Sequence, residues 1–82
     1  AHNSMGEIYY YQGRCSEALD AFKHAIALNP DEPDRYWNVA LSLKCLGRRD
    51  EAQQYLKTYL MQVTDLQKRA TAEKFMRELS LP

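Results

Sequence analysis

The sequence contains few of the residues that break or cross-link a chain: three glycines, three prolines and two cysteines in 82 residues. No apolar run approaches the roughly 18 residues that cross a bilayer, so we expect no membrane insertion. Neither sign of charge dominates, because eleven basic side chains balance eleven acidic ones. This balance argues against electrostatic binding of nucleic acid or of an anionic membrane by the domain as a whole.

The motifs of catalytic and cofactor sites are also missing. There is no glycine-rich phosphate loop, no His-Glu-x-x-His zinc motif and no nucleophile elbow. Of the two histidines, His2 lies at the terminus, and His24 is expected to face solvent. We therefore predict that the chain is not an enzyme and binds no metal and no cofactor.

The cysteines, Cys15 and Cys45, follow no zinc-site or redox-motif spacing. We expect two reduced, partly buried thiols, with a disulfide between them as the alternative. Reduced thiols make a reducing, cytoplasmic compartment the default. Because the chain begins with alanine rather than methionine, we expect it to be a piece of a longer protein.

The remaining pattern is helical throughout. No stretch alternates β-branched and polar residues as a half-buried strand requires. Gly13 and Gly47 are typical of the turns that follow helix ends, and Pro30 ends a helix because proline has no backbone N–H to donate. We predict five helices, over residues 2–12, 16–28, 33–46, 50–62 and 65–79. The last two are either separate or one bent rod.

Short polar residues stand where these helices are expected to start. Ser16, Asp31 and Asp50 are good N-cap residues for the second, third and fourth helices. Thr64 or Asp65 is expected to cap the fifth.

The chain repeats itself with a period of 34 residues: Glu17 and Ala18 recur as Glu51 and Ala52. A fixed period of this length predicts stacked helical hairpins. Small residues would let the helices approach, and large ones would fill the gaps between them. Further pairs at this spacing, most of them similar in size, are His2/Tyr36, Met5/Val39, Gly6/Ala40, Tyr9/Leu43, Gly13/Gly47, Phe22/Leu56 and Ala25/Tyr59.

At these positions the chain resembles the tetratricopeptide repeat family, whose consensus is W-x2-L-G-x2-Y, then glycine, then A-x3-F, alanine and proline. The first copy matches at Met5, Gly6, Tyr9, Gly13, Ala18, Phe22, Ala25 and Pro30. The second matches at Tyr36, Val39, Ala40, Leu43, Gly47, Ala52 and Leu56. It departs at Tyr59, where the family prefers alanine, and at Thr64, where it prefers proline. These departures suggest that the array ends there.

The resemblance implies an all-α solenoid of about five antiparallel helices with a concave inner face. We expect a truncated first repeat over residues 1–30, a second repeat over 31–64 and a capping helix over 65–82 that hides the last apolar face. A linker helix is the alternative for the last segment, and a generic helical bundle is the alternative for the whole fold.

The resemblance also implies that the first helix of each pair lines a peptide-binding groove. Tyr10, Tyr11 and Trp37 are expected to be its anchors, because the stack already has packing aromatics elsewhere and Tyr and Trp are favoured at binding hot spots. The alternative is that they pack on upstream repeats or lie on the surface. The expected groove residues are Asn3, Glu7, Tyr10, Tyr11, Trp37, Asn38, Leu41, Lys44 and Lys68, with Asp34, Cys45, Thr71 and Phe75 beside them.

Asn38 stands where family members hold the backbone or terminal carboxylate of a peptide. The clamp for acidic chaperone tails resembles a set of lysine, two asparagines, lysine and arginine, of which only Asn38 and Lys68 match. Asn3, Glu7 and Ala72 stand where lysine, asparagine and arginine belong. Because Glu7 would repel a carboxylate, we predict that such tails are not recognised.

The predicted function is a non-catalytic scaffold that binds a peptide or helix of a partner protein in this groove. One alternative is self-association as a homodimer through the exposed repeat end. Another is a regulatory or substrate-docking segment of a larger enzyme. Arg14, Arg48 and Arg49 lie on the two equivalent turns, but interleaved Asp50 and Glu51 weaken any case for nucleic acid.

Overall fold

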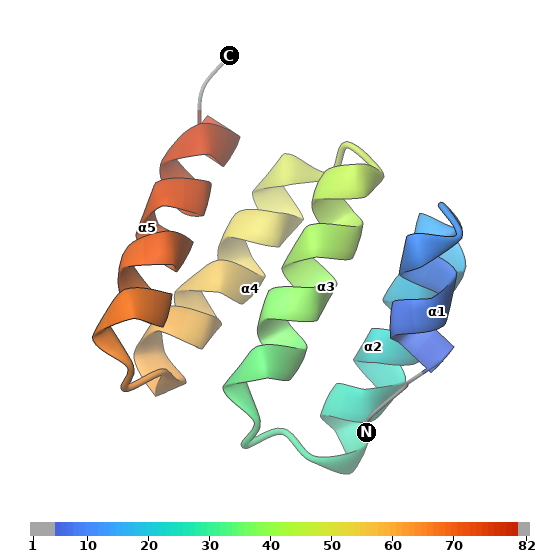
Figure 1. Ribbon diagram of the computed structural model, residues 1–82, viewed down its shortest axis with the longest axis horizontal. Helices are drawn as coiled ribbons and strands as arrows, with labels where there is room; N and C mark the ends of the chain where they lie inside the picture. The colour runs from blue at the N-terminus through green and yellow to red at the C-terminus, as the bar shows by residue number, and fades with distance from the viewer. Residues whose placement is uncertain (1–4, 81–82) are drawn as a thin grey trace.

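The computed structural model describes residues 5–80, which form five helices and no strand (Figure 1). The chain is therefore all-α, as predicted, and α4 and α5 are separate helices. The predicted start of the first helix at His2 lies outside the described residues. The helices are α1 (Met5–Tyr11), α2 (Cys15–Leu28), α3 (Pro33–Cys45), α4 (Arg49–Gln62) and α5 (Leu66–Ser80).

The turns after α1 and α3 have the same geometry, one repeat period apart. Gly13 and Gly47 have φ values of 79° and 78°, a conformation that glycine adopts without steric cost. In each turn, the N–H of the residue after the glycine donates to a carbonyl oxygen in the preceding helix, at 2.8 Å after Gly13 and 2.9 Å after Gly47. The repeat seen in the sequence is therefore also a repeat of backbone structure.

The starts of α2 and α4 correct two predicted caps. Arg14 and Arg48 occupy the N-cap positions, with φ of −96° and −95° and ψ of 69° in both, and neither makes a side-chain cap bond. Ser16 and Asp50 lie inside the first turn instead. The carbonyl of each arginine already accepts the first helical hydrogen bond, and its guanidinium pairs with the glutamate three residues ahead at 2.7 Å.

Of the other two predicted caps, one is absent and one is formed. Asp31 does not cap α3, because Glu32 precedes the helix and makes no side-chain cap bond. Pro33, the first residue of α3, needs no partner for a backbone N–H. At α5, Asp65 is the cap: its Oδ1 accepts the backbone N–H groups of the second and third residues after it, at 2.8 and 3.2 Å.

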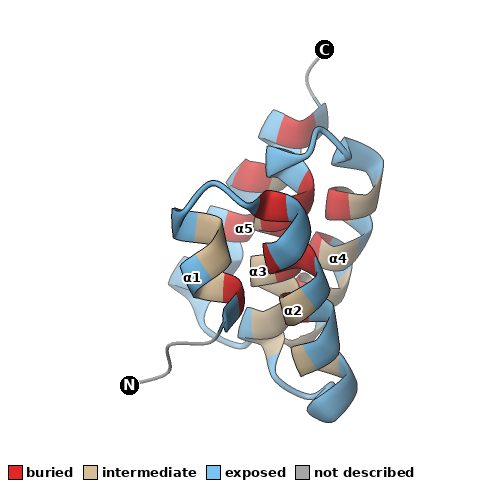
Figure 2. Ribbon diagram, turned by 90° about the vertical axis from the view of Figure 1, so that its right-hand side faces the viewer, coloured by how far each residue is buried: buried red, intermediate tan, exposed pale blue. Residues whose placement is uncertain are grey.

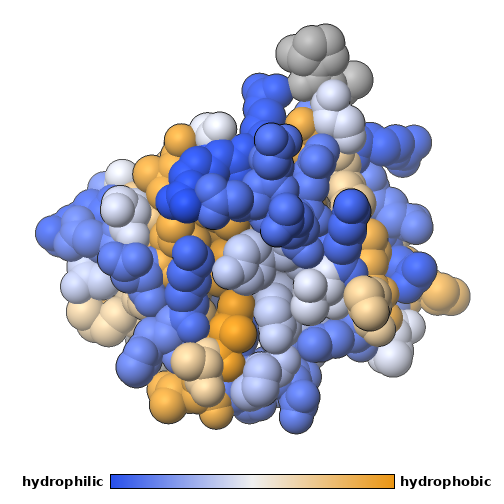
Figure 3. All heavy atoms as spheres, turned by 180° about the vertical axis from the view of Figure 1, so that it is seen from behind, coloured by the Kyte–Doolittle hydropathy of each residue, from blue (hydrophilic) through white to orange (hydrophobic). Residues whose placement is uncertain are grey.

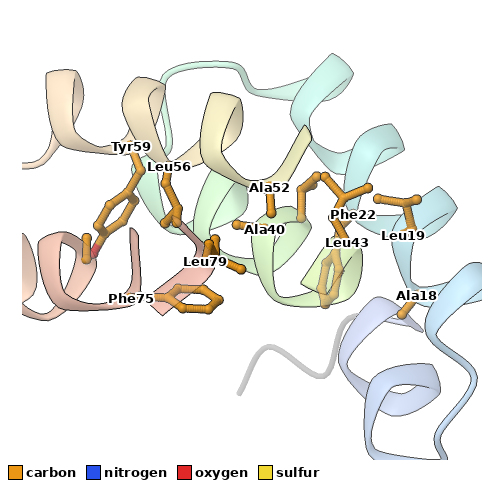
Figure 4. Close-up of a cluster of buried hydrophobic side chains, with 12 residues drawn as sticks. Ala18, Leu19, Phe22, Ala40, Leu43, Ala52, Leu56, Tyr59, Phe75 and Leu79 are labelled. Atoms are coloured by element: carbon orange, nitrogen blue, oxygen red, sulfur yellow. The ribbon is translucent and has the colours of Figure 1, made fainter. Parts of the chain in front are cut away.

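The helices stack in chain order, with α1 against α2, α2 against α3, α3 against α4 and α4 against α5 (Figure 1). The buried residues lie on the parts of the helices that are turned toward neighbouring helices (Figure 2). Ala18 of α2, Ala40 of α3 and Ala52 of α4 have no exposed surface, and large side chains fill the space beside them (Figure 4). The core comprises Ala18, Leu19, Phe22, Val39, Ala40, Leu43, Ala52, Leu56, Tyr59, Ala72, Phe75 and Leu79.

α1 lies directly on the ring of Phe22. A Cβ built on Gly6 would lie 2.5 Å from the Cε1 atom of that ring, closer than real Cβ contacts allow. The absence of a side chain at Gly6 therefore sets the distance between α1 and α2.

A disulfide joins Cys15 to Cys45, which overturns the expectation of two free thiols. Cys15 opens α2 and Cys45 closes α3, and the packing of these helices brings the Cα atoms to 6.2 Å, within the range for a disulfide. The 30-residue separation gives no hint of this proximity. The expectation of a reducing compartment rested on free thiols and loses that basis.

On the face seen from behind, apolar side chains show as narrow strips between larger polar areas (Figure 3). α1 carries an exposed apolar stripe of Met5, Ile8 and Tyr11, which are 56%, 40% and 84% exposed. Within residues 5–80, no helix has the length and apolar character to cross a membrane.

Candidate functional site

A hollow of about 280 Å³, here the α1–α3 hollow, opens beside α1 and α3. All but one of its lining residues belong to the groove set predicted from sequence. The exception is Phe22, which sequence reasoning assigned only to packing. The lining comprises Glu7, Tyr10, Tyr11, Phe22, Trp37, Asn38 and Leu41.

A second hollow, of about 330 Å³, is the α3–α5 hollow. It contains Lys68, another predicted groove residue, whose Nζ lies 3.7 Å from Oδ1 of Asp34. Both side chains are more than half exposed, so water screens this ion pair and a ligand can displace it. The lining comprises Asp34, Trp37, Tyr59, Gln67, Lys68 and Thr71. Trp37 lines both hollows and joins them.

Trp37 also holds α5 in place. Its ring centroid lies 5.5 Å from that of Tyr59 and 5.2 Å from that of Phe75. The expectation that the stack does not need this aromatic is wrong, because its ring fills the space between α3, α4 and α5. Tyr59, the departure from the family's alanine, supplies the large side chain on α4 and is only 3% exposed.

The two tyrosines at the end of α1 are less constrained. The rings of Tyr10 and Tyr11 lie 6.0 Å apart at 75°, an edge-to-face arrangement. Tyr11 is the more exposed, and Tyr10 is half-buried. Tyr11 is therefore the aromatic whose removal should disturb the fold least.

The remaining predicted groove residues differ in their surroundings. Asn38 and Leu41 are half-buried on α3 and line the α1–α3 hollow. Lys44 lines neither hollow, because its Nζ lies 4.9 Å from the centroid of the Phe75 ring. Cys45 is committed to the disulfide, and Asn3 lies outside the described residues.

The charges of the two hollows differ. The lining of the α1–α3 hollow contains the Glu7 carboxylate and no lysine or arginine, whereas the α3–α5 hollow has charges of both signs. Burial raises the pKa of the Tyr59 phenol above its ordinary value, and the nearby carboxylates of Asp34 and Asp65 raise it further. In residues 5–80, no three metal-ligating side chains gather as a metal site requires. His24 is exposed, as predicted.

A third hollow, of about 700 Å³, lies between α4 and α5 and is here the α4–α5 hollow. The amide of Gln53 donates to the Ser80 hydroxyl across it at 3.3 Å. Sequence reasoning did not single out this surface. Among its lining residues Leu60 and Met76 are apolar, and the others are polar or charged: Gln53, Lys57, Glu73, Arg77 and Ser80.

Comparison with known proteins gives a family match and one relative. A family model described as a tetratricopeptide (TPR) repeat matches residues 6–47, just over half of the chain. The uncharacterised protein MJ0572 of Methanocaldococcus jannaschii is 41% identical over an alignment of 54 residues that covers 56% of this chain. The chain spans 63% of that relative's length. No solved structure matches. With the family model covering both glycine turns and the helices between them, the chain belongs to the tetratricopeptide repeat family.

Proposed function

We propose that the chain is an interaction scaffold that binds a peptide or helix of a partner protein across the α1–α3 and α3–α5 hollows. Tetratricopeptide repeats are generally protein–protein interaction motifs, and stacked repeats present extended binding surfaces. The observation that carries the proposal is the lining of the α1–α3 hollow, which includes four aromatic residues, one side-chain amide and one carboxylate. Aromatic anchors supply buried area, and an amide can donate to and accept from a peptide unit.

The proposal includes the division into a repeat over 1–30, a second over 31–64 and a capping helix over 65–82. Supporting it, arginines one period apart make similar contacts. Arg35 donates to the carbonyl oxygen of Ala25 at 3.2 Å, and Arg69 donates to that of Leu60 at 2.8 Å. Each arginine thus ties the start of one helix to the helix before it, so α5 follows α4 much as α3 follows α2.

Peptides selected from a phage-displayed random library test the groove. A selected peptide, titrated into the ¹⁵N-labelled chain, is expected to shift the amide signals of α1 and α3. Tyr11→Ala and Asn38→Ala should each weaken binding about tenfold, as for a hot-spot side chain. Their melting temperatures should match that of the parent chain.

Met61→Ala is the control, because Met61 is 85% exposed on α4 and lines neither hollow. The proposal fails if no peptide is selected above background. It also fails if the Tyr11 and Asn38 variants bind as tightly as the Met61 variant.

The exposed stripe on α1 favours a second candidate, self-association. Met5, Ile8 and Tyr11 recur at three-residue spacing, which places them on one face. Light scattering over a range of concentrations is expected to show a dimer that Ile8→Lys returns to a monomer. A parent chain that stays monomeric at the highest concentration removes this candidate.

A further inference from the structure

We propose that Cys45 is a site of reversible covalent modification by a small thiol, formed by exchange at the Cys15–Cys45 disulfide. This inference is independent of the proposed function. Cys15 is only 5% exposed, whereas Cys45 is exposed. The two ends of the same bond therefore differ in their access to solvent, and a thiol dissolved in water reaches the bond from the Cys45 end.

The place of each cysteine in its helix explains the difference in burial. Cys15 is the first residue of α2. Ala18 and Leu19, three and four residues further on and so on the same helix face, belong to the hydrophobic core. Cys45 is the last residue of α3, and residues 46–48, which follow it, are all exposed. The fold thus buries one end of the disulfide and leaves the other at an exposed helix end.

The direction of the exchange follows from this access. A thiolate attacks one sulfur of a disulfide and displaces the other, and the rate depends on which sulfur the attacker can reach. An attack on the Sγ atom of Cys45 comes from the solvent side, and Cys15 is then the leaving sulfur. An attack on Cys15 would have to pass through the buried surroundings of that residue. The mixed disulfide is therefore expected on Cys45.

The exchange balances without an oxidant or a reductant. The small thiol gives its proton to water, and its sulfur forms a new bond to the Sγ atom of Cys45. The bond between the two cysteines breaks, and its electron pair leaves with the Sγ atom of Cys15, which takes up a proton. In the folded chain the Cα atoms of the two cysteines lie 6.2 Å apart, so the Cys15 thiol stays beside the adduct at a high effective concentration. Its return attack on Cys45 restores the disulfide, which makes the modification reversible.

The helix ends favour the same leaving sulfur. Cys15 lies at the start of α2, where the partial charge of a helix is positive and stabilises a departing thiolate. Cys45 lies at the end of α3, where the partial charge is negative. Arg14 and Arg48 are close to the cysteines in sequence, but each pairs with a glutamate, so their charges are balanced. Access and helix position therefore agree on Cys45 as the modified residue.

Brief exchange with glutathione, followed by peptide mapping, tests the site on the unmodified sequence. The oxidised chain is incubated with reduced glutathione and quenched with excess N-ethylmaleimide in urea at mildly acidic pH, where thiol exchange is slow. Trypsin then separates Cys15 and Cys45 into the peptides 15–23 and 45–48. Mass spectrometry should find glutathione on Cys45 about tenfold more often than on Cys15, because only the Cys45 end of the bond is accessible.

The same exchange carried out in urea is the matched control. Unfolding removes the difference in burial and keeps the neighbours of each cysteine in sequence, so the ratio of the two adducts should fall toward one. Mercaptoethanol, which carries no charge, should show the same preference for Cys45 as glutathione in the folded chain, because access rather than charge directs the attack.

Four outcomes would overturn the inference. Equal adducts on the two cysteines of the folded chain, or an excess on Cys15, would show that Cys45 is not the preferred site. No adduct in the folded chain, under conditions that exchange the unfolded chain, would show that the fold protects both ends of the bond. A preference that persists unchanged in urea would trace it to the neighbours in sequence. A preference with glutathione but not with mercaptoethanol would trace it to charge.

Discussion

Gly6 and Tyr59 set distances between neighbouring helices, Gly6 because it has no side chain and Tyr59 because its side chain is large. Gly6 has no Cβ and lets α1 lie on the ring of Phe22. Tyr59 replaces the family's alanine and packs against Trp37. A substitution at either position should therefore have a measurable effect on stability.

Gly6→Ala should destabilise the chain. Forcing a methyl group into a packed contact typically costs about 1–3 kcal/mol, which exceeds the roughly 0.5–1 kcal/mol that alanine gains over glycine in a helix. Urea denaturation measures the difference. In a Phe22→Leu background the same substitution should cost less, because the clashing ring atoms are gone. Equal costs in the two backgrounds would show that the ring contact is not the cause.

Tyr59→Phe should change the pH dependence of stability at high pH. Because burial raises the pKa of Tyr59 in the folded chain, the unfolded chain loses this proton first as the pH rises past about 10. The unfolded state is then favoured, so the free energy of unfolding falls between the unfolded and folded pKa values and is unaffected below them. Urea denaturation from neutral to high pH should show a smaller fall in Tyr59→Phe. Parallel curves for the two proteins would contradict the shifted pKa.

At the scale of elements, α5 is held mainly by one aromatic cluster. Phe75 contacts Trp37 and lies under Lys44, and Ala72 and Leu79 share its buried face. The rest of α5 is largely exposed. This helix is therefore expected to open before the α2–α3–α4 core does.

Phe75→Ala should detach α5 preferentially. Removing a buried phenylalanine costs about 3–5 kcal/mol, which is comparable to the opening energy of a terminal element. Hydrogen exchange followed by mass spectrometry should show lost protection over residues 66–80 with α2 and α3 still protected. Leu66→Ala, at a position 80% exposed, is the control. Uniform loss of protection along the chain would mean that α5 and the core unfold together.

The sequence predicts the helices better than their caps. Gly13 and Gly47 mark turns because they adopt a positive φ, and Pro30 marks a turn because it has no backbone N–H to donate. The caps at Ser16 and Asp50 fail because Arg14 and Arg48, two residues before them, occupy the N-cap positions. Cap preferences differ by about 1 kcal/mol, which local turn geometry can override.

The position of a residue within the repeat predicts which face of its helix it occupies, and this much of the candidate site can be predicted from the sequence. Register brings Glu7, Tyr11 and Asn38 to one hollow, as expected. It does not predict that Lys44 turns toward Phe75, since that contact depends on where α5 docks. The assignment of Glu7, Tyr11 and Asn38 as binding residues stays a prediction until a ligand is tested.

At the scale of the whole molecule, the disulfide is a covalent link between α2 and α3. Cys15 and Cys45 are 30 residues apart in sequence and join α2 to α3. Neither cysteine has a cysteine one period away, so the 34-residue repeat could not suggest the pair. The bond restrains α2 and α3, both of which contribute residues to the lining of the α1–α3 hollow.

Reduction of this disulfide should lower the stability of the whole chain. Cross-linking across a loop of this length is worth about 3–4 kcal/mol by the loop-entropy relation. Urea denaturation with and without reductant measures the change. A chain carrying both Cys15→Ser and Cys45→Ser should not respond to reductant. An equally stable parent chain under both conditions would show that the bond contributes nothing in solution.

Charged side chains in the α4–α5 hollow oppose the docking of a further helix there. One period earlier, the positions of Gln53, Glu73, Met76 and Arg77 hold residues of the buried core: Leu19, Val39, Ser42 and Leu43. A helix from another copy that docked there would have to strip water from Glu73 and Arg77, which is costly unless both charges are paired. Head-to-tail contacts between repeats otherwise propagate into open filaments. If copies pair through the α1 stripe, as the second candidate function proposes, face-to-face pairing would end in a closed dimer rather than a fibre.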